Sequence, residues 1–384
     1  MKVSLTDICD FQGGTQPPKD EWIDQPAQGY VRMLQIRDFT QSDKNYIEYV
    51  KDTGKLKTCI EDDILIGRYG ASIGKILTGL AGAYNVAIVK TIPDEKVVSK
   101  KYLYWYLNSQ YFQRFISNVG SRAAQAGFNK NDLGAAQIPL VDKERQEEIC
   151  EMLEKANKLI SLRKQQLAKL DELIKARFVE MFGDFEFNPK EFPVYHLCEL
   201  CDVGSSKRIY QEEQSISVIP FLKVADLNEL IDTGKYSCST FIPLERYEQL
   251  LHKELTPTEN DILITSRGTL VKCYIVQSDD EFYFQDGMIS WLSNFSPKVS
   301  SIYISYLFAQ PYIQKQIESL QAGSTVAYLS IAMLKKINVI LPPKKLQDDF
   351  ATFVEHVDQQ KQTVQQSLEK LELLKKALMQ EYFG

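Results

Sequence analysis

The sequence is poor in the residues that commonly build metal and catalytic centres. Its 384 residues include three histidines and seven cysteines. The cysteines are odd in number and lack the regular spacing of a disulfide framework, which is typical of proteins in a reducing compartment. We therefore expect a cytoplasmic protein with free thiols and without a metal site.

Long apolar runs are also missing. No stretch approaches the ~18 apolar residues that a membrane span needs, and the N-terminus lacks a signal-peptide pattern. With 44% hydrophobic and 25% charged residues, the composition is that of an ordinary soluble protein without a membrane partner. The net charge of −6 argues mildly against nucleic acid as a partner, but a local basic cleft can coexist with acidic helices.

Three segments resemble catalytic or ligand-binding motifs, and each fails on its residues. Gly67–Ile76 follows a predicted strand, but its glycine spacing does not fit a phosphate-binding loop and isoleucine replaces the required Ser/Thr. Cys198 and Cys201 have the spacing of a zinc or redox pair, but the repeat described below matches only Cys201 with a cysteine. Asn188-Pro189 matches only the start of an adenine-methyltransferase signature. We therefore predict no catalytic residues and no cofactor in this chain.

A long charged stretch, residues 142–183, dominates what is present. Its apolar residues recur at alternating steps of four and three, which indicates a helix that packs along another helix. These seam residues are Ile149, Leu153, Ala156, Ile160, Leu167, Leu170 and Ile174. Acidic residues crowd its first turns, as the helix dipole favours, and Gly183 is a plausible end.

The same stretch recurs 201 residues later, at 344–384, where Gln347 matches Gln146 and Phe383 matches Phe182. Its seam consists of Phe350, Val354, Val357, Val364, Leu368, Leu371 and Leu378. The polar interruptions do not coincide: they are Arg163 and Arg177 in the first copy, and Lys361 and Lys375 in the second. This difference predicts that the two helices pair with each other. The alternative is two separate dimerisation helices.

The segments before the two helices are also copies of one another. Residues 1–141 form a predicted strand-rich domain, and residues 184–343 repeat its order. We predict a strand at Tyr30–Phe39, of which Arg32–Phe39 is matched by Pro220–Leu227 so that Asp226 lies over Asp38. The sequence DILI occurs at 63–66 and 261–264, each time before an Arg/Gly turn. An aromatic helix predicted at Tyr102–Ile116 recurs at 303–317, and its rings Tyr102, Trp105, Tyr303 and Tyr306 are expected in the core.

This ordered duplication resembles the specificity subunit of type I restriction–modification systems over essentially the whole chain. The resemblance rests on the two DILI segments, the aromatic helices and the helix ends Met181-Phe182-Gly183 and Tyr382-Phe383-Gly384. It implies an α+β fold in which two α/β target recognition domains are separated by two long antiparallel, coiled-coil-like helices. It also implies double-stranded DNA with a split, asymmetric target as the ligand. The implied partners are two methylation subunits, which hold S-adenosylmethionine, and restriction subunits when present.

The resemblance transfers no DNA-reading residue, so the candidates come from side-chain chemistry. Arg, Asn and Gln read base edges, whereas Lys, Ser and Thr hold phosphates. In the first domain the candidates are Thr15, Gln16, Lys19, Arg68, Tyr69, Lys75, Arg122, Asn129 and Lys130. In the second domain they are Ser205, Ser206, Lys207, Arg208, Thr265, Ser266, Arg267, Lys272, Ser324 and Thr325. Arg68 and Arg267 rank first because they are expected in equivalent turns.

Two alternative functions of the chain are a helical scaffold without DNA reading and part of a fused modification enzyme.

Overall fold

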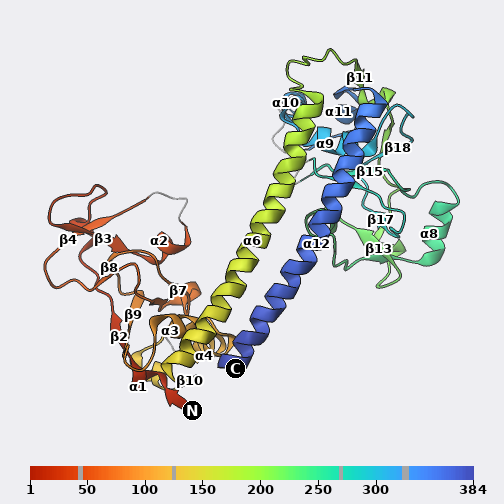
Figure 1. Cartoon of the computed structure of the whole chain (residues 1–384). Coiled ribbons are helices and arrows are strands. Elements are labelled where there is room, and N and C mark those ends of the chain that lie inside the picture. Colours follow the sequence, from red (N-terminus) through yellow and green to blue (C-terminus); the bar gives the residue numbers. More distant parts are fainter. Residues whose placement is uncertain (42–45, 123–126, 268–270, 322–327) are drawn as a thin grey trace. The chain divides into compact units, whose positions relative to one another are not determined.

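The computed structural model describes residues 1–41, 46–122, 127–267, 271–321 and 328–384 (Figure 1). It divides into two compact units, Met1–Gln166 with Val364–Gly384, and Leu167–Thr363. Helix α6 (Lys143–Phe182) begins in the first unit and ends in the second, and α12 (Lys344–Phe383) begins in the second and ends in the first. The predicted four-part division at residues 141, 183 and 343 stays a prediction, because the compact units cut across both helices.

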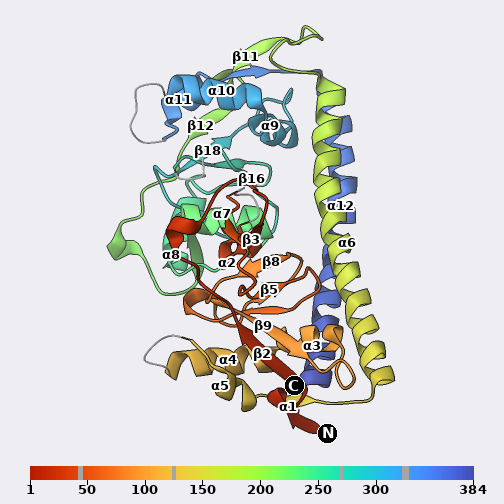
Figure 2. The same ribbon diagram turned by 90° about the vertical axis from the view of Figure 1, so that its left-hand side faces the viewer.

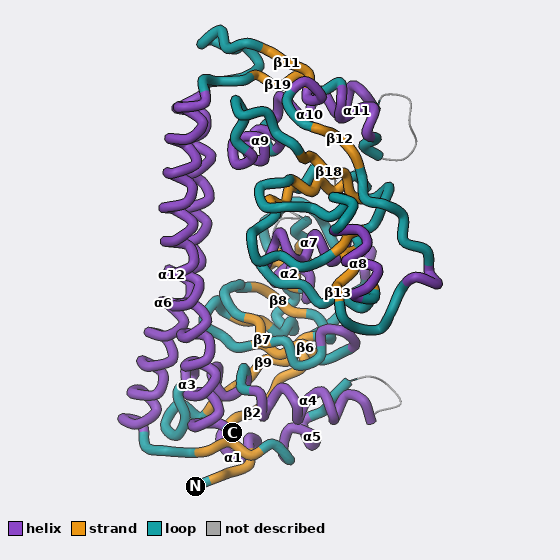
Figure 3. Tube along the Cα trace, turned by 90° about the vertical axis from the view of Figure 1, so that its right-hand side faces the viewer, coloured by secondary structure: helices purple, strands orange, loops and turns teal. Residues whose placement is uncertain are grey.

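The first unit contains two four-stranded sheets and a terminal strand pair. One sheet has the order β2-β9-β6-β7, the other β4-β3-β8-β5, and β1 pairs with β10. The strands are β1 (Lys2–Ser4), β2 (Cys9–Gly13), β3 (Tyr30–Leu34), β4 (Tyr49–Lys51), β5 (Thr58–Cys59), β6 (Leu65–Gly67), β7 (Ile76–Leu77), β8 (Gly82–Tyr84), β9 (Ile88–Pro93) and β10 (Gln137–Pro139). The short helices are α1 (Leu5–Ile8), η1 (Lys19–Glu21), α2 (Ile36–Thr40), η2 (Gly70–Ser72), α3 (Lys100–Leu107), α4 (Gln110–Arg122) and α5 (Lys130–Gly134). Helices α4 and α5 lie next to each other in Figures 2 and 3.

The second unit repeats this plan. Its four-stranded sheet has the order β12-β18-β15-β16, a three-stranded sheet has the order β14-β13-β17, and β11 pairs with β19. The strands are β11 (Val194–His196), β12 (Asp202–Gly204), β13 (Ile219–Leu222), β14 (Phe241–Ile242), β15 (Ile262–Thr265), β16 (Cys273–Ile275), β17 (Tyr283–Phe284), β18 (Ile289–Ser293) and β19 (Asn338–Ile340). The short helices are η3 (Leu197–Glu199), η4 (Gln211–Glu213), α7 (Val224–Thr233), α8 (Leu244–Leu251), α9 (Ser301–Phe308), α10 (Pro311–Leu320) and α11 (Ile331–Lys335). The predicted α+β tandem duplication is therefore confirmed.

The strand predicted at Tyr30–Phe39 is wrong in its second half. Strand β3 ends at Leu34 and α2 begins at Ile36, because the Gln35 amide donates to Asp38 Oδ2 at 2.7 Å and caps the new helix. The second unit repeats the error and its cause, since the Lys223 amide donates to Asp226 Oδ2 at 2.8 Å before α7. The repeated aspartate thus marks a helix start in both copies.

The aromatic helix predicted in each copy is two helices. In the first copy α3 ends at Leu107 and α4 begins at Gln110, and in the second copy Pro311 starts α10 three residues after α9 ends. Proline suits the first turn of a helix because its missing N–H has no partner there. The core position is confirmed for Tyr102, Trp105 and Tyr303, which are buried, whereas Tyr306 is half-buried.

The long helices pair with each other in each unit, and the alternative of separate dimerisation helices is wrong. In the first unit Lys375 Nζ donates to Asn157 Oδ1 at 2.7 Å, and Lys164 pairs with Glu372 at 2.9 Å. In the second unit Lys361 pairs with Asp171 at 2.8 Å. Because numbers rise along α6 while those of the partners fall along α12, the helices run antiparallel. The polar interruptions Lys361 and Lys375 therefore meet polar residues of the other helix.

A buried glutamine attaches the start of each long helix to its domain. Gln146 is fully buried; its Oε1 accepts from the Ser99 amide, and its Nε2 donates to the Val97 and Val141 carbonyls, all at 2.9 Å. Gln347 makes the same three bonds in the second unit, to Ser300 N, Lys298 O and Pro342 O, at 2.8–3.0 Å.

The end of each long helix packs into the opposite domain. Phe383 of α12 is buried in the first unit, with its ring centroid 5.1 Å from that of Tyr102. Phe182 of α6 is buried in the second unit, 4.9 Å from Tyr303. Each domain is thus held by the start of one long helix and the end of the other.

No helix among the described residues is long and apolar enough to cross a membrane.

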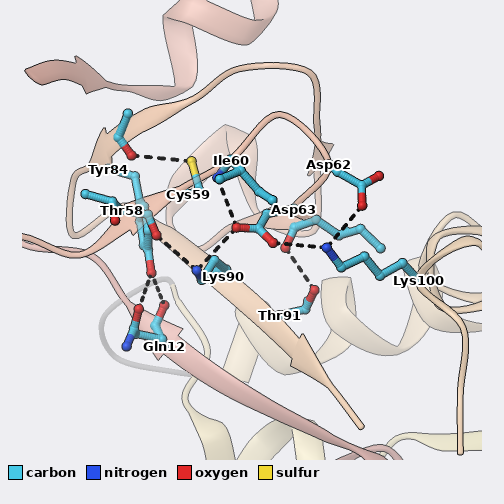
Figure 4. Close-up of polar contacts among 12 residues, drawn as sticks. Gln12, Thr58, Cys59, Ile60, Asp62, Asp63, Tyr84, Lys90, Thr91 and Lys100 are labelled. Atoms are coloured by element: carbon cyan, nitrogen blue, oxygen red, sulfur yellow. Dashed lines mark hydrogen bonds and ion pairs between the residues drawn. The ribbon is translucent and has the colours of Figure 1, made fainter. Parts of the chain in front are cut away.

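The aspartate of each DILI segment is tied to different partners. Asp63 accepts from the Ile60 amide at 3.1 Å and forms ion pairs with Lys90 at 3.2 Å and Lys100 at 3.4 Å (Figure 4). Burial alone would raise the pKa of Asp63, but the amide and the two lysines together hold it below its usual value. Asp261 accepts from Trp291 Nε1 at 2.9 Å and from the Thr258 amide at 2.8 Å. Burial dominates there, so the pKa of Asp261 is raised.

We therefore expect opposite results from the same substitution. Asp63→Asn loses two ion pairs and should lower the free energy of unfolding by about 1–3 kcal/mol at pH 7. Asp261→Asn keeps an acceptor oxygen for its donors and removes a buried charge, so stability at pH 7 should be unchanged or slightly higher. Because the pKa of Asp63 is lowered on folding, its contribution is present above pH ~4 and disappears as the pH falls through the folded-state pKa. Urea unfolding at pH 7 and pH 3.5 measures the free energy of unfolding of both variants. An equal loss of free energy in Asp63→Asn and Asp261→Asn at pH 7 would contradict this account.

Candidate nucleic-acid interface

Three segments that are distant in sequence meet at one edge of the first domain. In the loop after β2, the Gly14 amide donates to Ile88 O at 3.1 Å and the Thr15 amide to Tyr84 O at 3.0 Å. In the turn after β6, the Arg68 amide donates to Ala87 O at 2.8 Å. The segment 84–88 therefore brings the candidates Thr15, Gln16 and Arg68 to the same edge.

The second domain assembles the corresponding segments in the same way. Ser205 Oγ donates to Ile289 O at 3.0 Å, and the Lys207 amide donates to the Tyr283 hydroxyl at 2.7 Å. The Ser266 amide donates to Met288 O at 2.9 Å. The segment 283–289 thus joins the loop after β12 to the turn after β15. We call the two assemblies the recognition edges.

A fourth segment completes each recognition edge. Tyr69 forms a β-bridge with Gly127, and Arg68 Nε donates to Phe128 O at 2.9 Å, which places Asn129 and Lys130 close by. Asn129 caps α5 by accepting from the Asp132 amide, and Lys130 pairs with Asp10. In the second domain the equivalent β-bridge joins Arg267 to Tyr328.

The two leading arginines lie in equivalent turns, as expected, but one position apart. Gly67 lies opposite Ile88 and Thr265 lies opposite Ile289, so Ser266 takes the place of Arg68 and Arg267 takes that of Tyr69. Arg68 is half-buried and lies 5.0 Å from the Tyr69 ring. Arg267 is exposed and lies 4.8 Å from the Tyr328 ring. Both guanidiniums are nevertheless held on an aromatic face, a cation–π arrangement that fixes their orientation.

Four other candidate cations occupy different environments. Lys19 lies over the Trp22 ring at 3.8 Å and pairs with Glu48. Lys75 is exposed, and its carbonyl accepts from the Gly67 amide across the turn. Lys272 pairs with Asp232 at 2.5 Å. Arg208 pairs with Asp286 at 2.9 Å but keeps 65% of its side chain exposed, so a ligand can reach it.

Three candidate hydroxyls are buried inside the second domain. Thr265 Oγ1 accepts from the Lys272 amide at 3.1 Å, Ser266 Oγ shares a hydrogen bond with Ser290 Oγ at 2.7 Å, and Ser206 Oγ donates to Phe284 O at 2.7 Å. Their exposed fractions are 0%, 1% and 9%. Because these hydroxyls hold the turns together, we leave them out of the proposed contact set. Ser324 and Thr325 lie outside the described residues, and Arg122 ends α4 with a side chain outside the described part.

The thiols do not form a metal or redox site in the described part of the chain. Cys201 is buried while Cys198 is exposed, and burial raises the pKa of the Cys201 thiol to about 12. The matching Cys9 is also buried, with its pKa raised to about 12 for the same reason. Neutral buried thiols are poor nucleophiles and poor metal ligands. No group of three or more His, Cys, Asp or Glu residues suited to a metal ion occurs among the described residues.

The described residues therefore contain two copies of one arrangement, in which corresponding loops and turns meet at an edge of each domain. A family model described as the type I restriction modification DNA specificity domain matches residues 1–172 and 189–373. The chain therefore belongs to this family and contains its domain twice.

Individual relatives agree with the family match. The chain is 24% identical to the type I restriction enzyme MjaVIII specificity subunit of Methanocaldococcus jannaschii, covering 98% of this chain and 90% of the relative. It is 26% identical to a putative type I restriction enzyme specificity subunit of Haemophilus influenzae, covering 67% and 64% respectively. The crystal structure of a type I restriction–modification S subunit from M. genitalium shares the fold, with a TM-score of 0.59 at 16% identity over 100% of this chain and 96% of that chain. A chain from a structural account of complex assembly in the type I R-M system gives a TM-score of 0.61 at 14% identity, over 100% and 97%.

The loop after β2 offers a test of how tightly the first recognition edge is built. A Cβ at Gly14 would lie 2.1 Å from Asn85 O and 2.3 Å from Tyr84 O, whereas a Cβ at Gly13 would meet nothing closer than Arg68 Nη1 at 3.9 Å. We expect Gly14→Ala to lower the free energy of unfolding by about 1–3 kcal/mol through overpacking, and Gly13→Ala to change it by less than about 0.5 kcal/mol. Urea unfolding measures the free energy of unfolding of the two variants. A Gly14→Ala variant as stable as Gly13→Ala would show that the loop can move away from segment 84–88.

Proposed function

We propose that this chain is the DNA-recognition subunit of a type I restriction–modification complex. It binds double-stranded DNA sequence-specifically, and each domain reads one half of a split, asymmetric target. The observation that carries the proposal is the repeated recognition edge in the two copies of a DNA specificity domain. Corresponding segments meet in both copies, and the turn after the DILI strand is held by the same backbone hydrogen bond, Arg68 N to Ala87 O and Ser266 N to Met288 O, while the side chains differ.

The differing side chains explain why the two half-sites differ. Gln16 follows Thr15 in the first domain, and Arg208 follows Lys207 at the corresponding place in the second. Gln pairs with adenine and Arg with guanine through two hydrogen bonds in the major groove, so the same place on the edge favours different bases. Arg68 and Arg267 also lie one position apart in the repeat, so the two arginines would meet different positions of their half-sites. Two domains of the same fold that carry different hydrogen-bond donors thus select an asymmetric target.

The paired helices supply a surface for the methylation subunits. In the first unit Leu159, Leu162, Leu373 and Leu374 are exposed by 46–68%. Leu159 precedes the seam residue Ile160, and Leu374 precedes Lys375, the polar interruption of the second seam. Both leucines therefore lie on one side of the helix pair. Asn157, Lys164 and Glu372 lie on the other side, where they share a groove with Trp105 of the domain. The exposed leucines, which we call the leucine face, are suited to an apolar helix of a methylation subunit.

The chemistry of modification belongs to those partners. The methylation subunits hold S-adenosylmethionine and modify adenine, and restriction subunits join the complex when they are present. This chain places the target sequence before them without a catalytic residue of its own. The scaffold alternative, in which the helices join proteins without DNA, predicts that the chain selects no sequence from a pool of random duplexes.

We expect Arg68→Ala and Arg267→Ala each to weaken binding to the selected target. An arginine that reads guanine should cost about 1–3 kcal/mol on removal and relax one position of one half-site, a different half-site for each variant. Lys96→Ala is the control, because this exposed lysine follows the end of β9 that is remote from the Arg68 turn. Selection from random duplexes followed by titration measures both motif and affinity. Unchanged motifs and affinities in both arginine variants would place the DNA elsewhere.

The leucine face makes a separate prediction. Leu159→Lys combined with Leu374→Lys should leave stability within about 0.5 kcal/mol, because both side chains are exposed, but should weaken binding of the methylation subunit at least tenfold. Leu251→Lys in α8 is the matched control, since that leucine is 51% exposed. Co-purification and calorimetry with the methylation subunit provide the measurement. Equal binding by the double variant and the control would show that the partner docks on another surface.

A further inference from the structure

A buried carboxylate in the first domain holds three polar side chains together. Glu48 is 5% exposed, and its carboxylate accepts from Lys19 Nζ, from Arg37 Nη2 and, at 2.6 Å, from Gln35 Nε2. The Arg37 guanidinium also lies 4.8 Å from the ring of Tyr46. We call these five residues the Glu48 cluster.

The Glu48 cluster adjoins the first recognition edge. The Asn85 amide donates to Leu34 O at 3.1 Å, so the segment 84–88 that holds Thr15 also holds the end of β3. The next residues are Gln35 and Ile36, and Ile36 Cδ1 lies 3.3 Å from the place of a Cβ on Gly67, directly before Arg68. The cluster is therefore placed beside the loop after β2 and the turn after β6.

The fold itself does not require the cluster. Met33 donates to Glu48 O at 2.8 Å, and in the second domain Phe221 donates to Thr240 O at 2.9 Å, so Thr240 occupies the place of Glu48. The residue before the repeated helix-capping aspartate is Arg37 in the first domain and Ala225 in the second. Burying a carboxylate costs several kcal/mol before its partners compensate. The second domain builds the same strand pairing without that cost, so this pairing does not depend on the cluster.

The geometry of Arg37 shows what that role can be. One nitrogen of its guanidinium is bound to Glu48, one face lies on Tyr46, and 39% of the side chain remains exposed. A guanidinium has five N–H donors, and among the described residues Glu48 is the hydrogen-bond partner of the Arg37 guanidinium. Because Nε is buried, the donors left for a ligand are those at the Nη1 and Nη2 end of the group. A planar, oriented donor pair matches guanine O6 and N7. Lys19, bound to the same carboxylate with 65% of its side chain exposed, is a point charge suited to a phosphate.

We propose that Arg37 reads a guanine in the half-site of the first domain, with Glu48 and Tyr46 as positioning residues and Lys19 on the neighbouring phosphate. The inference rests on the proposed function and adds a base-reading residue to it.

The test is selection from random duplexes by the full chain and its variants. Arg37→Ala should lower affinity for the wild-type target about 5- to 150-fold, which is about 1–3 kcal/mol at 1.4 kcal/mol per tenfold, and relax one guanine position of one half-site. Arg37→Lys keeps the charge and the Glu48 partner but lacks the planar donor pair, so it should relax the same position with a smaller loss of affinity. Glu48→Gln should relax that position too, and combining it with Arg37→Ala should add little.

Several outcomes would overturn the inference. A folded Arg37→Ala variant that selects an unchanged motif, with affinity either intact or reduced evenly across sequences, excludes base reading by Arg37. Thermal unfolding of each variant, with Lys96→Ala as the control for one lost charge, separates these effects from misfolding. If the wild-type chain selects a split motif, the proposed function stands whatever Arg37 does. A wild-type chain that selects no motif overturns both.

Discussion

The arrangement of this protein depends on the way a buried glutamine joins each long helix to its domain. Gln146 and Gln347 are fully buried, and each satisfies one amide and two carbonyls of its domain. Losing such a partner leaves buried backbone groups unpaired, at a cost of about 1–3 kcal/mol each. The glutamine also orients the first turn of the helix, and with it the seam that the other helix must meet. The aromatic contacts of Phe383 with Tyr102 and of Phe182 with Tyr303 then pack the end of the other long helix into the same domain.

Much of this architecture could be predicted from the sequence, because the long helices and the duplication are strong periodic signals. The seam residues and the displaced interruptions Lys361 and Lys375 were sufficient to predict that the helices pair. The failures are local. Alternating apolar residues in Tyr30–Phe39 are typical of a strand. The strand nevertheless ends at Leu34, because the hydrogen bond from the Gln35 amide to Asp38 caps a helix that begins at Ile36. That cap was visible in both copies as a repeated aspartate, and its meaning was missed.

The candidate site was less accessible to sequence reasoning, since its parts come from four segments. Nothing in the sequence joins Tyr69 to Gly127, or Arg267 to Tyr328, because those bridges depend on the tertiary fold. Burial of Ser206, Thr265 and Ser266, and the gathering of Lys19 and Arg37 on Glu48, likewise depend on the packed domain. The one-residue shift between Arg68 and Arg267, in contrast, could be found in the sequence, because the DILI segments align Arg68 with Ser266 without a gap.

The joints between helix and domain are made largely by main-chain groups, which has an evolutionary consequence. The side chains of Gln146 and Gln347 recognise amides and carbonyls that every amino acid supplies. At this joint a substituted domain needs only the same main-chain path, whereas the contacts of Phe182 and Phe383 also require matching aromatic side chains. Exchange of a domain would therefore be limited by the packing of the helix ends rather than by the glutamine joints.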